Sequence, residues 1–201
     1  MASFVKFNAN PYGKNTGDCV VRSLVGATLL GYRTISELLG EKLFPGVGVP
    51  HGVEFRKVEE FSSETGLIEP FDLEISEDME ITRKDLVQFG RYGGFPLKFW
   101  IDKLGGRTGS PRMVFQTKLN PEDMIPGSSS KNFHQVYANV SLGRYYDTWD
   151  CGNTIVFAAY GTDVSKVSKK DDPRYFSSER DVLRSEQEEY LGTRFRNREK
   201  T

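Results

Sequence analysis

Cysteine is scarce in this chain, and the sequence also lacks the features that identify secreted and membrane proteins. The two cysteines, Cys19 and Cys151, lie far apart and outside any Cys-x-x-Cys pattern. A secreted disulfide framework is therefore not indicated, and we expect a reducing compartment. The sequence also lacks the roughly 20 consecutive apolar residues of a membrane span, and its first residues lack the pattern of a signal peptide. We expect a cytoplasmic protein with no membrane partner.

Neither sign of charge dominates, because the formal net charge is -1 and the pI is about 6.2. The chain has no basic field that would attract phosphate backbones, so nucleic acid is not an expected partner. Histidine is as scarce as cysteine, with His51 and His134 alone. These two and the cysteines do not show the short ligand spacing of zinc sites. We expect no metal ion and no cofactor.

The first part of the sequence predicts helices. The run after Cys19 is apolar almost all round, with Asp18 placed to cap its N-terminus and Gly31 placed to end it. Thr82, with Asp85 three residues later, gives a weaker cap signal of the same kind. The predicted helices are residues 19–30, 34–43, 52–65 and 82–91.

The later part predicts strands, because short runs rich in β-branched and aromatic residues alternate with turn residues. The predicted strands are residues 113–119, 134–140, 144–150 and 154–160. Gly143, at a positive φ angle, suits a tight hairpin that pairs Val140 with Arg144. Helices followed by antiparallel strands predict an α+β domain over residues 1–161. Residues 162–201 are a charged tail with one predicted helix, whose apolar strip offers a docking surface for another protein.

Cys19 is the candidate nucleophile. In the first turn of a helix, unpaired backbone N–H groups and the positive end of the helix dipole favour a thiolate. The same N–H groups can stabilise the oxyanion that forms when a thiolate attacks a carbonyl. The alternative is that Cys19 is a small buried apolar residue, which is the usual role of cysteine.

His134 is the candidate base. It begins a predicted strand, which would hold the imidazole in place, whereas His51 lies in a loop rich in glycine and proline that would not. The predicted hairpin register sets Asp150 opposite His134, within reach of the imidazole. Asp147 is the alternative, and this register places it about four positions along the strand. We therefore predict a site of Cys19, His134 and Asp150.

The order of these residues resembles that of papain-like cysteine peptidases: a cysteine at a helix N-terminus, a histidine that opens a strand, and an Asn or Asp on the next strand. The segment GDCVVRS, residues 17–23, is similar to the nucleophile segment of that superfamily, above all of its small phage- and bacterium-encoded members. The segment FHQVYANV, residues 133–140, is similar to the histidine strand. Asp147-Thr148-Trp149 is similar to the Asn-Ser-Trp segment of papain, a likeness that favours Asp147. Gly13 stands where papain has an oxyanion-donating Gln. For Asn15 two roles stay open, that of a substitute donor and that of a turn-forming residue.

The resemblance implies a papain-like fold, in which N-terminal helices and a central helix that bears the nucleophile pack on a C-terminal antiparallel sheet. It implies a cysteine protease or related thiol hydrolase that cuts a peptide or isopeptide bond of a polypeptide substrate. It also implies a viral (bacteriophage) or bacterial protein of the host cytosol or the virion. The alternative is a papain-like domain that serves as a structural or binding component, such as a part of a phage particle or a host-interaction protein, because a fold does not fix a function.

Overall fold

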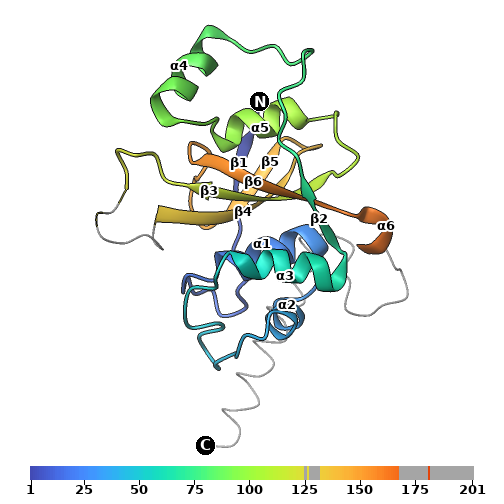
Figure 1. Cartoon of the computed structure of the whole chain (residues 1–201). Coiled ribbons are helices and arrows are strands. Elements are labelled where there is room, and N and C mark those ends of the chain that lie inside the picture. Colours follow the sequence, from blue (N-terminus) through green and yellow to red (C-terminus); the bar gives the residue numbers. More distant parts are fainter. Residues whose placement is uncertain (125, 127–131, 168–180, 182–201) are drawn as a thin grey trace, which may run out of the picture.

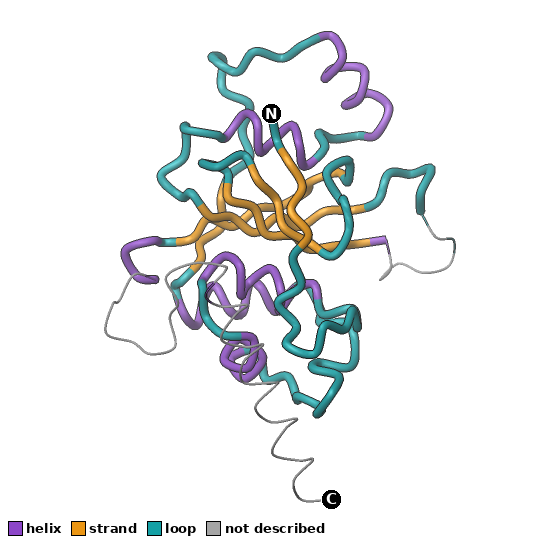
Figure 2. The backbone as a smooth tube through the Cα atoms, turned by 180° about the vertical axis from the view of Figure 1, so that it is seen from behind, coloured by secondary structure: helices purple, strands orange, loops and turns teal. Residues whose placement is uncertain are grey.

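A six-stranded sheet lies between two layers of helices in the computed structural model, which describes residues 1–124, 126, 132–167 and 181 (Figure 1). Helices α1 (Cys19–Thr28), α2 (Tyr32–Leu38) and α3 (Arg56–Thr65) cover one face, and α4 (Arg83–Tyr92) and α5 (Leu97–Leu104) lie on the other. The short α6 (Val164–Val167) follows the last strand. The view from behind shows the same layers (Figure 2). The α+β prediction is confirmed, and the predicted tail helix lies outside the described residues.

The sheet is mixed and not purely antiparallel as predicted. Its strands are β1 (Ser3–Lys6), β2 (Ile68–Phe71), β3 (Arg112–Lys118), β4 (Phe133–Asn139), β5 (Arg144–Asp147) and β6 (Ile155–Thr162). Their order across the sheet is β1-β5-β4-β3-β6-β2. The N-terminal strand β1 adds to the edge parallel to β5, whereas the other pairs are antiparallel.

Helix α1 is the buried centre of one layer. Its residues from Val20 to Thr28 are all buried, as expected for a helix that is apolar almost all round. The helix ends at Leu29, which takes the left-handed conformation that the sequence assigned to Gly31. Gly26 lets the helix approach the ring of Tyr137 on β4, where a larger residue would overlap that ring. The approach brings the C-terminal half of α1 close to β4.

Most of the other predicted elements are confirmed, with shifted boundaries. Gly66 and Gly93 end α3 and α4 in the left-handed conformation, and Thr82 with Asp85 forms a capping box. The four predicted strands correspond to β3, β4, β5 and β6. The elements α5, α6, β1 and β2 were not predicted. Both strands have only four residues, too few for an alternating pattern to show.

Two apolar core clusters lie on opposite faces of the sheet. One joins α1, α2 and α3 to residues such as Val114 and Tyr137, and the other joins α5 to residues such as Phe115 and Val136. Because helices pack on both faces of the one sheet, its strands, among them β4 and β5, are held from two sides. Among the described helices, none combines the length and apolar character needed to cross a membrane.

Candidate functional site

Cys19 is the first residue of α1 and is partly exposed in a cleft of about 700 Å³. Asn15 and Gly17, from the loop before the helix, line the cleft beside it. His134 and Phe133, at the start of β4, line the same cleft. The nucleophile and base predicted from the sequence therefore meet in one open cleft, although they are far apart in the chain.

Asp147 lies behind the ring of His134. The Nε2 atom of His134 is hydrogen-bonded to Oδ2 of Asp147, which is the last residue of β5. The ring lines the same cleft as Cys19, and a ring nitrogen lies within 4.8 Å of the Cys151 Sγ. The indole of Trp149 contacts the imidazole, with ring centroids 5.2 Å apart. Since Nε2 is used by Asp147, Nδ1 is the nitrogen left for Cys19.

The prediction that Asp150 lies opposite His134 is wrong. Gly143 has the predicted positive φ of 61°, but Arg144 pairs with Asn139 and not with Val140. The strand then ends at Asp147, so Asp150 falls in the turn that follows. There Asp150 accepts a hydrogen bond from the Tyr145 hydroxyl at 2.5 Å and lies 3.5 Å from Lys98 Nζ.

A one-residue change of register turns every side chain of a strand to the other face, which is why the predicted pairing misplaced both carboxylates. The likeness of residues 147–149 to the Asn-Ser-Trp segment pointed to the carboxylate that the structure places behind the ring, Asp147.

Asp147 and His134 shift each other's pKa toward the charged form. Burial opposes the charged form of His134, but the hydrogen bond with Asp147, the two neighbouring thiols and the charge of Asp147 raise the pKa of His134 well above 6.5. Burial would raise the pKa of Asp147, but His134 and the guanidinium of Arg22 outweigh it and lower that pKa. Oδ1 of Asp147 also accepts hydrogen bonds from Arg22 at 3.0 Å and from the Thr148 backbone N–H at 2.6 Å.

Cys151 is the second thiol of the cluster and is fully buried. Burial raises the pKa of its thiol to about 11, although the hydrogen bond with His134 acts in the opposite direction. The thiol is therefore protonated at neutral pH, and its Sγ lies 3.6 Å from Oδ2 of Asp147 as a donor. A thiol of this kind is a poor nucleophile.

The donor atoms of His134, Asp147 and Cys151 all lie within 4.8 Å of one another, close enough to raise the question of a metal ion. Their donors are already joined to one another by hydrogen bonds, and the cation of Arg22 adjoins the carboxylate. We therefore assign no metal site to these residues. The second histidine, His51, lies 3.1 Å from Glu41 and is not part of the cluster.

An oxyanion formed at Cys19 would meet two kinds of donor. The first backbone N–H groups of α1 have no acceptor within the helix. Asn15 lines the cleft beside Cys19, and its Nδ2 donates to the Thr148 hydroxyl at 3.3 Å, which leaves one amide proton for a ligand. Gly13, which the resemblance sets at the position of a donor, is not among the residues that line this cleft.

Sequence reasoning missed the contribution of Arg22, Trp149 and Cys151 to this site. Arg22 follows Cys19 by one helical turn, so it lies on the same face of α1, and a charged residue within an otherwise apolar helix was the available signal. The burial of Cys151 depends on the turn after β5 and has no such signal. Comparisons of the chain with protein-family models, curated proteins and solved structures found no significant match.

Proposed function

We propose that this protein is a cysteine-dependent hydrolase of peptide or isopeptide bonds, with a papain-like arrangement of Cys19, His134 and Asp147. The observation that carries the proposal is that Cys19 and His134 line one open cleft, while Nε2 of the same imidazole is hydrogen-bonded to Asp147. Cys19 is partly exposed in this cleft, and the Asp147 carboxylate is buried. A nucleophile at a helix N-terminus, a base and an orienting group are the parts that acyl transfer needs.

The proposed reaction proceeds through a thioester. His134 takes the proton of the Cys19 thiol, and the thiolate attacks the carbonyl carbon of the substrate. Backbone N–H groups of the first turn and the Asn15 amide stabilise the oxyanion. His134 then donates its proton to the leaving amine, and the C–N bond breaks. Water, deprotonated by His134, hydrolyses the thioester, which releases the acid and restores Cys19.

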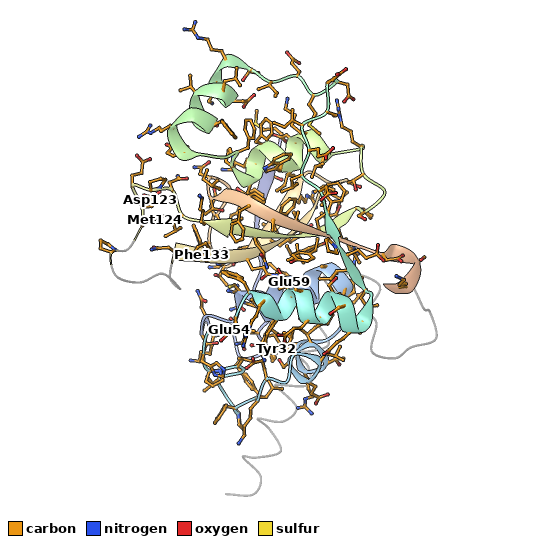
Figure 3. The ribbon with its side chains drawn as sticks, in the orientation of Figure 1. Tyr32, Glu54, Glu59, Asp123, Met124 and Phe133 are labelled. Atoms are coloured by element: carbon orange, nitrogen blue, oxygen red, sulfur yellow. The ribbon has the colours of Figure 1, made fainter. Side chains whose placement is uncertain are left out.

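The walls of the cleft favour an extended polypeptide with a large apolar side chain. Phe55 and Phe133 pack edge to face, with centroids 6.0 Å apart, and both line the cleft. Trp149 lines it as well and is 40% exposed. Glu54, which precedes α3, lies on the same side of the molecule as Phe133 (Figure 3). Exposed aromatic surface of this kind binds apolar side chains.

We expect the purified full chain to cleave members of a diverse peptide mixture, with new N-termini detected by mass spectrometry. Cys19→Ala abolishes this cleavage because it removes the nucleophile. Cys151→Ala, the matched variant of the other thiol, keeps the nucleophile and so retains measurable cleavage, at a rate altered by the loss of the contact of Cys151 with Asp147. Cleavage by Cys19→Ala contradicts the mechanism. A folded wild type that cleaves nothing contradicts the hydrolase and favours a binding or structural role, as in a phage particle.

A further inference from the structure

A buried cation joins the helix of the nucleophile to the carboxylate of the site. Arg22 is only 4% exposed. Its Nε donates to Oδ1 of Asp18 at 2.9 Å, and its Nη1 donates to Oδ1 of Asp147 at 3.0 Å. Asp18 directly precedes α1, whereas Asp147 ends β5 on the other side of the cluster. The guanidinium therefore bridges two carboxylates that come from distant parts of the chain.

Asp18, at one end of this bridge, is itself held in place by hydrogen bonds. Oδ2 of Asp18 accepts hydrogen bonds from the Tyr32 hydroxyl at 2.5 Å and from the Asn10 amide at 2.9 Å. Asp18, Tyr32 and Asn10 are all buried, so the position of Arg22 is set by fixed groups. A buried ion pair gives little net stability relative to an apolar replacement, because desolvation offsets the attraction. A role in the site explains its presence better than stability does.

We propose that Arg22 is a positioning residue for the Cys19–His134 pair, because it fixes one oxygen of Asp147 and leaves the other for the imidazole. Arg22 lies one helical turn after Cys19 on α1, so its bond to Asp147 also fixes the helix N-terminus relative to the ring. The catalytic meaning of this role rests on the proposed function. The hydrogen bonds of Arg22 and the measurement of the His134 pKa do not depend on whether the protein cleaves a substrate.

The bridge also balances charge around the ring. Among the residues that the structure describes, the ionisable groups that act on His134 are Asp147, Cys19 and Cys151, and those that act on Arg22 are Asp147, Asp18 and Cys19. Without the guanidinium, the full charge of Asp147 would act on the imidazolium. His134 would then hold its proton more tightly and release it less readily to a leaving group.

The test is a measurement of the His134 pKa by NMR titration of the imidazole. The chain has two histidines, so His51→Gln leaves His134 as the single ring signal. In that background, we expect Arg22→Met to raise the His134 pKa by about one unit or more. Arg22→Lys keeps the charge and should keep the His134 pKa near that of the parent. A residue needed only for folding would not produce this difference between two folded variants.

Asp18→Asn is the second variant, in case Arg22→Met does not fold. It removes a carboxylate from the far end of the bridge, so Arg22 acts more fully on Asp147 and the His134 pKa should fall. An unchanged or opposite shift of the His134 pKa in the folded variants overturns the proposal. The pKa measurement uses no substrate, so it is independent of the cleavage assay. An unchanged His134 pKa would overturn the role of Arg22 alone, and an absence of cleavage would overturn the hydrolase alone.

Discussion

Asp147→Asn should reduce peptide cleavage by about 10²- to 10⁴-fold, because the site needs two acceptor oxygens at this position. His134 and Arg22 donate to different oxygens of Asp147. An amide has one acceptor oxygen, so its NH₂ group must face either the imidazole or the guanidinium. If it faces the imidazole, the ring takes the tautomer in which Nδ1 carries the proton and cannot accept one from Cys19. The measurement is kcat/KM on a peptide that the wild type cleaves.

Asp150→Asn is the matched control, because it makes the same chemical change three residues away. Asp150 bonds Tyr145 and Lys98 and is 53% exposed at its side chain. We expect kcat/KM to change by less than about threefold, as for surface substitutions away from a site. A larger loss in Asp150→Asn than in Asp147→Asn would show that the register of β4 and β5 in solution places Asp150 behind the ring.

Gly26→Ala should lower the free energy of unfolding by about 1 to 3 kcal/mol, the cost of overpacking a core. A methyl group at Gly26 would overlap the ring of Tyr137. That ring is 1% exposed and stacks on Tyr146 with centroids 5.0 Å apart, so it has no room to move away. The helix must therefore move from the sheet, and Cys19 moves with it. Urea unfolding followed by circular dichroism measures the loss.

Gly90→Ala is the control for the change in backbone preference. Gly90 lies in α4, and a methyl group there meets no atom within 4 Å. Alanine is favoured over glycine inside a helix by about 0.5 to 1 kcal/mol, so this variant should be more stable than the wild type. Equal stability changes in the two variants would show that α1 does not approach β4 as closely as described.

Helix and turn boundaries could be predicted from the sequence where they depend on the residues at the boundary itself. The capping box at Thr82, the glycine stops at Gly66 and Gly93, and the hairpin glycine Gly143 each act through their own backbone, so they could be predicted without tertiary context. Cys19 at a helix start and His134 at a strand start were predicted by the same kind of signal.

The relation between elements could not be predicted in the same way. The choice between Asp147 and Asp150 depends on a single-residue difference in pairing, and no local preference decides it. The bridge through Arg22 joins residues 125 positions apart, and only the folded chain brings them together. The edge strand β1 pairs with β5 from the far end of the sequence, and its four residues carry no pattern of their own.

The most direct test of the central claim is the rate at which iodoacetamide alkylates each cysteine of the folded chain at pH near 7, measured by peptide mass spectrometry. Cys19 should react at least about tenfold faster in the wild type than in His134→Ala, because the imidazolium stabilises the thiolate. Cys151 should remain unmodified in both proteins, since it is buried. Equal rates for Cys19 with and without His134, in variants that remain folded, would contradict the proposed pairing of nucleophile and base.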